Sequence, residues 1–91
     1  MDPTKNIIKY SKIFELGTYS LETDFVATPV LDDFSLCYVF TLRNSGEIRN
    51  HVHGATFFKD DIKSCIVATV NMYLKTRGIN DHIDETSIEI K

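Results

Sequence analysis

The chain has 91 residues, of which 43% are hydrophobic and 25% are charged. This ordinary composition excludes a disordered chain, and the length fits one small domain over residues 1–91, with 1–6 and 79–85 as loose or loop segments. A formal net charge of −3 excludes a strongly basic protein, so any contact with nucleic acid or anionic membrane would need a local basic patch.

The two cysteines indicate the compartment. Cys37 and Cys65 each lie inside an apolar run, and two thiols are too few for a disulfide scaffold. We therefore expect reduced cysteines and a cytoplasmic protein. No apolar stretch is long enough to cross a membrane, and we expect neither a signal peptide nor a lipid anchor.

Alternation predicts that the chain begins with a β-hairpin. Apart from Lys12, apolar side chains fill the even positions from Ile8 to Leu16, which favours a strand over the helix that Asp2-Pro3 would allow. Gly17-Thr18 fits a two-residue type II′ turn. The second strand is predicted over residues 19–28, ended by Pro29 because proline cannot donate a hydrogen bond. The expected pairs are Leu16 with Tyr19, Phe14 with Leu21, Lys12 with Thr23, Tyr10 with Phe25, and Ile8 with Ala27.

A second hairpin is predicted between Phe34 and Gly54. Its first strand carries apolar residues at even positions, namely Phe34, Leu36, Tyr38, Phe40 and Leu42. We predict a three-residue loop, Asn44-Ser45-Gly46, because a two-residue loop would place Leu42 beside Arg49 and mix the two faces. The three-residue loop pairs Leu42 with Ile48 and Tyr38 with Val52, and it places Cys37 opposite His53.

One helix and a short strand complete the prediction. Asp60 or Asp61 can cap the helix, and Gly78 ends it. Its apolar residues recur at helical spacing, at Ile62, Cys65, Ile66, Val70, Tyr73 and Leu74. We expect this helix to cover the even-numbered face, and residues 86–91 to form a short C-terminal edge strand. The fold class is α+β, a four-stranded antiparallel meander followed by one amphipathic helix.

The first candidate site is a metal site. His51 and His53 are two positions apart on a strand, so both side chains project from one face. With Cys37 opposite His53, a Cys/His/His set of zinc ligands is conceivable. No further ligand pair occurs at a recognised spacing, so we assign no metal or other cofactor.

Nucleic-acid binding is a second possibility. Five cations or histidines should share the outer sheet face, Lys9, Arg43, Arg49, His51 and His53. In element order, four meandering strands and then a helix over about residues 8–77, the chain resembles the PC4-like single-strand DNA-binding fold. That resemblance implies a single-stranded nucleic-acid binder that uses its sheet face. The negative net charge argues against it.

Protein binding is the favoured function. No catalytic motif is present, so we expect no enzyme activity. The outer sheet face should hold apolar residues among polar ones, as partner or dimer surfaces do. We predict a non-catalytic adaptor or inhibitor module that binds a protein partner or itself, of the kind that a phage or other mobile element encodes. The expected partner-binding residues are Ile13, Val26, Val39, Arg43, Arg49, His51 and His53.

Overall fold

The computed structural model describes residues 7–59 and 61–90. The chain divides into two compact units, residues 1–59 and residues 60–91. The predicted loose segment 1–6 and the alternative helix cap Asp60 lie outside the described residues, as does Lys91.

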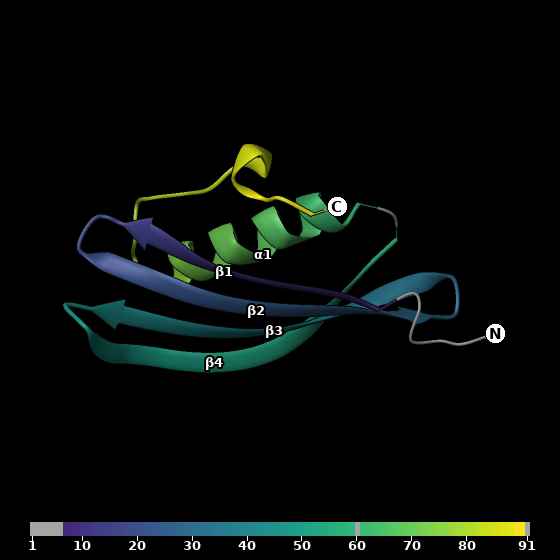
Figure 1. The fold of residues 1–91 in the computed structure, drawn as a ribbon, viewed down its shortest axis with the longest axis horizontal. Helices are drawn as coiled ribbons and strands as arrows, with labels where there is room; N and C mark the ends of the chain where they lie inside the picture. The colour runs from purple at the N-terminus through teal and green to yellow at the C-terminus, as the bar shows by residue number, and fades with distance from the viewer. Residues whose placement is uncertain (1–6, 60, 91) are drawn as a thin grey trace. The chain divides into compact units, whose positions relative to one another are not determined.

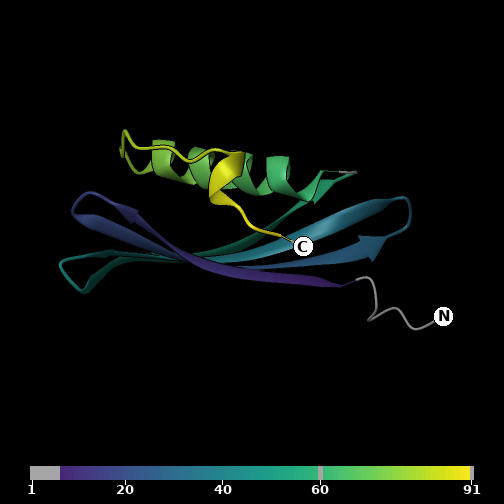
Figure 2. The same ribbon diagram turned by 45° about the horizontal axis from the view of Figure 1, so that its top comes forward.

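The first unit is a single antiparallel sheet. Its four strands follow one another in space as they do in sequence, in the order β1-β2-β3-β4 (Figure 1). The strands are β1 (Ile8–Leu16), β2 (Tyr19–Val30), β3 (Asp33–Asn44) and β4 (Glu47–Phe58). Figure 2 shows the strands twisting along their length, as sterics require of L-residues. The predicted four-stranded meander is confirmed.

The first hairpin has the predicted register. All five expected pairs occur, from Leu16 with Tyr19 to Ile8 with Ala27. Gly17 has a φ of +67°, while Thr18 is not among the residues with positive φ. This is the pattern of a type II′ turn, whose first central residue alone needs a positive φ. Alternation and a glycine at the turn were therefore sufficient to fix this hairpin.

The second strand is longer than predicted. Pairing with β3 continues through Pro29, opposite Phe34, to Val30, opposite Asp33. The β2–β3 loop has two residues, so the pair next to it, Val30 with Asp33, is the hydrogen-bonded one. Pro29 therefore lies in the next pair, whose residues do not bond to each other across the two strands. Among the described residues, β1 begins only opposite Ala27, so the absent N–H of Pro29 breaks no ladder bond. The prediction that Pro29 ends the strand was wrong.

The β3–β4 loop also differs from the prediction. It has two residues, Ser45 and Gly46, and both have positive φ, 54° and 82°. Asn44 pairs with Glu47, and the register then shifts between Leu42 and Arg43. The predicted three-residue loop, with its pairs of Leu42 with Ile48 and Tyr38 with Val52, was therefore wrong.

A bulge at Arg49 explains how the two-residue loop is accommodated. Arg43 pairs with Ile48 and Leu42 with Asn50, so Arg49 is the extra residue. The bulge restores alternation beyond it, because Val52 then lies opposite Phe40. Ile48, by contrast, moves to the face that carries Arg43 and is 56% exposed.

One face of the sheet is buried. Its fully or nearly fully buried residues are Leu21, Thr23, Phe25, Ala27, Leu36, Phe40 and Leu42. The Phe25 ring meets Phe40 edge-to-face at 5.7 Å, and Tyr38 stacks on Phe40 at 4.9 Å. Thr23 is the only polar residue of this set, and its hydroxyl donates to the Lys12 carbonyl at 2.7 Å. Phe14 and Leu16 of β1 are also buried, so this face is the apolar wall that alternation predicts, with Lys12, opposite Thr23, as its charged exception.

The second unit is built on helix α1 (Ile62–Thr76). Asp61 caps its first turn by accepting hydrogen bonds from the Ser64 backbone and side chain, at 3.2 and 2.8 Å. At the other end Gly78 has a φ of +73°. Gly78 N donates to the Lys75 carbonyl and Ile79 N to that of Leu74, which is the Schellman arrangement. The predicted cap and stop are confirmed.

The tail after α1 does not form the predicted edge strand. The described part of residues 86–91 has no strand, and Glu85–Ser87 forms a 3-10 turn, η2. The Asn71 side chain pairs with the Ile83 backbone instead, donating to its carbonyl at 2.9 Å and accepting from its N–H at 2.8 Å. This pairing brings the tail back alongside α1 (Figure 1), and Ile83 and Ile88 are buried.

The molecule as described belongs to the α+β class, with four antiparallel strands followed by one helix. The position of that helix over the even-numbered face stays a prediction. Among residues 7–59 and 61–90, no helix combines the length and apolar character that a membrane span requires.

Candidate functional site

The face of the sheet opposite the buried wall is the candidate site, and we call it the outer face. Cross-strand pairing arranges its side chains in rows that run from β1 to β4. From the β3–β4 turn onward the rows are Glu15-Ser20-Arg43-Ile48, Ile13-Glu22-Thr41-His51, Ser11-Asp24-Val39-His53, Lys9-Val26-Cys37-Ala55, and Thr28-Ser35-Phe57.

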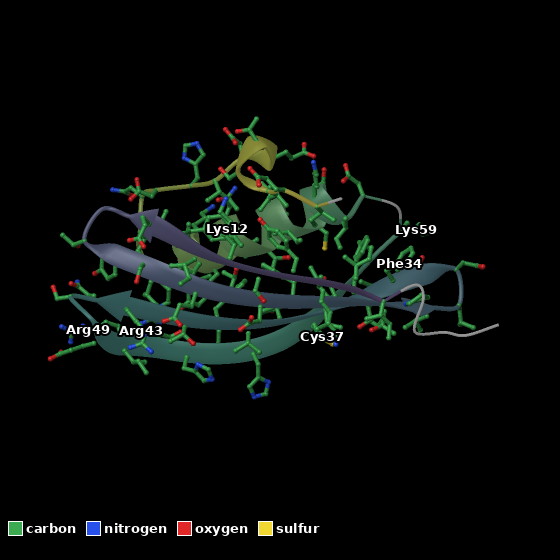
Figure 3. All side chains as sticks on the ribbon, in the orientation of Figure 1. Lys12, Phe34, Cys37, Arg43, Arg49 and Lys59 are labelled. Atoms are coloured by element: carbon green, nitrogen blue, oxygen red, sulfur yellow. The ribbon has the colours of Figure 1, made fainter. Side chains whose placement is uncertain are left out.

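Several polar side chains in the two rows nearest the β3–β4 turn pair with one another, although the same rows also carry the exposed Ile13 and Ile48. Arg43 forms an ion pair with Glu22 on the neighbouring strand. Thr41 Oγ1 and His51 Nδ1 lie 2.8 Å apart, within hydrogen-bond distance. Figure 3 shows Arg43 and Arg49 together at this end of the sheet and Cys37 farther along β3. These side chains already satisfy one another, so they are poorly disposed to bind a phosphate.

Arg49 occupies a different place from the other predicted site residues. As the bulge residue it is opposite no residue of β3, and its guanidinium lies 3.5 Å from the Glu47 carboxylate. Both side chains are largely exposed. A surface ion pair of this kind contributes at most about 1 kcal/mol. Arg49 therefore belongs to the hairpin tip rather than to the rows of the outer face.

Farther from the turn the outer face is hollowed and apolar. A hollow of about 580 Å³ opens on strands β2 to β4. Its lining residues are Asp24, Val26, Cys37, Tyr38, Val39, His53, Gly54 and Ala55. Asp24 is the only formally charged residue among them, and its carboxylate accepts a hydrogen bond from Ser11. The predicted site residues Val26, Val39 and His53 thus meet at one place.

Small side chains create this hollow. Ala55 lies opposite Cys37, and Gly54 lies opposite Tyr38. A Cβ on Gly54 would approach the Tyr38 hydroxyl to 2.6 Å, so the tyrosine ring lies directly across the glycine. The pair Gly54-Ala55 therefore lets Tyr38 close over β4 on one face and leaves space on the other.

Phe57 is a site residue that the sequence analysis missed. It lies two positions beyond Ala55 on the same face, and it is 65% exposed. Its signal is the alternation of His51, His53, Ala55 and Phe57, which continues the strand past Gly54. The second hairpin was predicted to end at Gly54. The structure extends β4 to Phe58 instead.

The predicted residues are not all brought together. Ile13, 57% exposed, lies in the second row on β1, and Arg43 lies at the turn end of β3. Neither lines the hollow. The predicted outer face is thus divided into a turn end, where paired polar side chains lie beside the exposed Ile13 and Ile48, and an apolar, hollowed end.

The register also changes the metal hypothesis. Cys37 lies opposite Ala55, and His53 lies opposite Val39, so the expected pairing of Cys37 with His53 was wrong. Across residues 7–59 and 61–90, no group of three His, Cys, Asp or Glu side chains is arranged to hold a metal ion. The proposed Cys37/His51/His53 set has lost the direct contact on which it relied.

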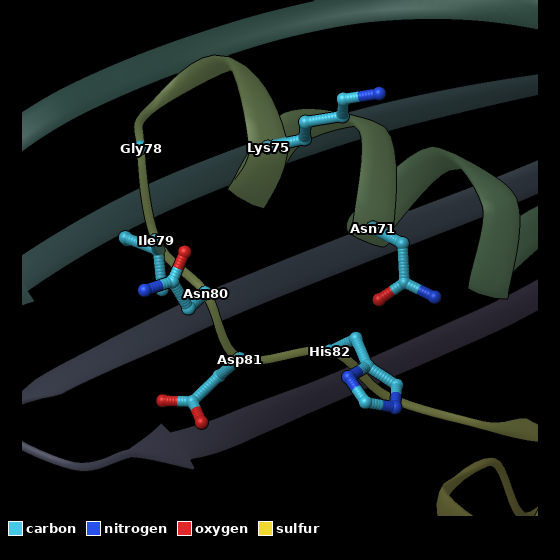
Figure 4. Close-up of a pocket in the computed structure, with 7 residues that line it drawn as sticks. All are labelled: Asn71, Lys75, Gly78, Ile79, Asn80, Asp81 and His82. Carbon is cyan, nitrogen blue, oxygen red and sulfur yellow. The ribbon is translucent and has the colours of Figure 1, made fainter.

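A second hollow, of about 310 Å³, lies at the end of α1 (Figure 4). Asn71, Lys75 and the segment 78–82 line it. The Asn71 amide is committed to the Ile83 backbone. Lys75 suits the negative end of the helix dipole, so its position has a structural reason. We assign no function to this hollow.

The shifted pKa values point to structure rather than catalysis. Burial raises the pKa of the Cys65 thiol and of the Tyr73 hydroxyl, which keeps both protonated. Hydrogen bonds from Ser64 and Thr86 lower the pKa of Asp61 and Asp84. Both carboxylates are caps, of α1 and η2.

No protein-family model matches this chain, and neither a curated protein nor a solved structure does. The outer face is therefore interpreted from its own geometry.

Proposed function

We propose that this chain is a non-catalytic protein-interaction module, of the adaptor or inhibitor type, that binds through the outer face. The observation that carries the proposal is the hollowed apolar end of that face, with Val26 and Val39 in the hollow and Phe57 exposed beside it. Apolar surface gathered in one place, with polar residues around it, is the usual composition of a protein interface. We place this module in the cytoplasm, where its thiols would stay reduced.

Nucleic-acid binding ranks second because of the pairing of the cations. The outer-face Arg43 is held by Glu22, and Arg49 lies near Glu47. An arginine that must first leave a carboxylate gains less from a phosphate. A labelled single-stranded oligonucleotide at low salt should show no shift, and a shift weakened by both salt and Arg43→Ala would favour this alternative.

The test of the proposal is a charge placed in the hollow. Val39→Glu should abolish association with a partner or with a second copy while the circular dichroism spectrum stays unchanged, because an unpaired carboxylate is costly to bury. Val26→Asp should act in the same way. Affinity capture from the source cells and light scattering of the purified chain measure the two kinds of association.

Met72→Glu is the matched control. Met72 is 64% exposed and lies on α1, so this change adds the same charge at an apolar position outside the sheet, although one more exposed than the half-buried Val26 and Val39. The proposal fails if Val39→Glu and Val26→Asp alter neither captured partners nor molar mass. It also fails if Met72→Glu abolishes association to the same extent.

A further inference from the structure

Phe57 and the hollow beside it are complementary features on a single surface. Phe57 is a large aromatic side chain that is 65% exposed, an unusual position for a residue that contributes much to cores. The hollow begins at Ala55, two positions away on the same face of β4. Residues i and i+2 of a strand are about 7 Å apart, so the projection and the depression are adjacent.

We propose that the occupant of the hollow is Phe57 of a second copy of this chain. This inference rests on the proposed interaction function and names the partner. A two-fold axis between Phe57 and Ala55 would bring each phenyl ring over Ala55, at the β4 side of the other copy's hollow. A two-fold interface requires one patch that complements itself, and a projection next to a depression satisfies this requirement. A foreign partner would require only one of the two features.

The size of the face is consistent with such a dimer. Four strands about 4.8 Å apart, each contributing ten residues at about 3.4 Å, form a face of roughly 650 Å². Two such faces in full contact bury about 1,300 Å², and an offset contact buries nearer 1,000 Å², the lower limit for a specific interface. The dimer should therefore be of moderate strength, with a dissociation constant of about 1–100 μM.

The charges on the face also permit self-association. Asp24 is the only formally charged residue that lines the hollow, and Ser11 already donates to it. Arg43 and Glu22 form an ion pair nearer the β3–β4 turn, and the other charged residues of the rows, Lys9 and Glu15 on β1, have opposite signs. Two copies would therefore meet without a concentration of like charge at the contact, in spite of the net charge of −3 on each chain.

The experiment is sedimentation velocity of the full chain from about 1 μM to about 1 mM. The native protein should change from a 10.4 kDa species to one of twice that mass as concentration rises. Phe57→Ala removes the projection and Ala55→Phe fills the depression, and each should weaken dimerisation about 30-fold or more. Met72→Ala, which shortens an equally exposed side chain on α1, should leave the dissociation constant unchanged.

Two results would overturn the inference. One is a native chain that stays monomeric at about 1 mM, far above the expected dissociation constant. The other is a dimer that keeps its strength in Phe57→Ala, or in Ala55→Phe if the first variant fails to fold by circular dichroism. Either result would overturn the dimer without overturning the proposed function. Loss of a captured partner in Val39→Glu would still support protein binding by the outer face.

Discussion

The contact between Gly54 and Tyr38 predicts a defined loss of stability on substitution of the glycine by alanine. The added Cβ would lie 2.6 Å from the Tyr38 Oη and 2.8 Å from its Cζ. Both distances must grow by about 0.6–0.8 Å to reach 3.4 Å, where ordinary van der Waals contact begins. The Tyr38 ring cannot move freely, because it stacks at 4.9 Å on the fully buried Phe40.

The magnitude is a balance of two effects. Overpacking of this kind costs about 1–3 kcal/mol. Replacing glycine by alanine also restricts the unfolded chain, which stabilises the fold by about 0.4–1 kcal/mol. Gly54→Ala should therefore lower the free energy of unfolding by about 1–2 kcal/mol, which corresponds to a fall in Tm of about 4–16 °C for a chain of this size.

Urea unfolding followed by circular dichroism measures this change, and a double-mutant cycle tests its cause. In a Tyr38→Ala background the clash is absent, so Gly54→Ala should become neutral or slightly stabilising. Gly46→Ala is the matched control, because nothing lies within 4 Å of its added Cβ and its φ of +82° is the only source of cost. That cost should be the same in both backgrounds. An equal cost of Gly54→Ala in both backgrounds would refute the steric explanation.

Three further predictions concern the core, the tail and the helix cap. Phe40→Ala should lower the free energy of unfolding by about 3–5 kcal/mol. If α1 covers the buried face, a double-mutant cycle of Phe40→Ala with Ile66→Ala, measured by urea unfolding, should show a coupling energy above about 0.5 kcal/mol. Additive losses would contradict that placement of α1. Asn71→Ala should cost about 1–2 kcal/mol and speed hydrogen exchange of the Ile83 amide, whereas unchanged exchange would exclude the pairing. The Asp61 pKa lies below its ordinary 3.8, so the stabilisation by this cap is present above pH 3.8 and is lost as pH falls through the folded-state value. Asp61→Asn should reduce the fall in Tm between about pH 5 and pH 3, and an unchanged pH profile would rule out this contribution.

Much of the sheet could be predicted because its signals are local. Apolar residues at four of the five even positions of β1 fix its faces, and Gly17 supplies the positive φ that the first turn needs. The Asp61 cap and the Gly78 stop of α1 are equally local. Each of these features depends on residues within a few positions, so a single sequence contains the whole signal.

The candidate site was predicted less well because its geometry depends on a β-bulge that shifts the register between β3 and β4. With a regular ladder assumed, a two-residue loop at Ser45-Gly46 would mix the faces of β4, so we expected a longer loop. The Arg49 bulge absorbs the extra residue instead and changes the pairing of every residue after it. The expected neighbour of Cys37 changed from His53 to Ala55, and the metal hypothesis lost its geometry with that change.

The sequence by itself determined that the chain forms two consecutive hairpins and one helix, which faces of β1, β2 and β3 are apolar, and where the helix begins and ends, because periodicity and capping act over a few residues. Only the tertiary structure decided which residues of β3 and β4 meet. The bulge, the fit of Tyr38 over Gly54 and the hollow beside Phe57 arise from packing between chain segments that are up to 31 positions apart, from Asp24 to Ala55. A pattern along one strand does not specify how far that strand slides against its neighbour.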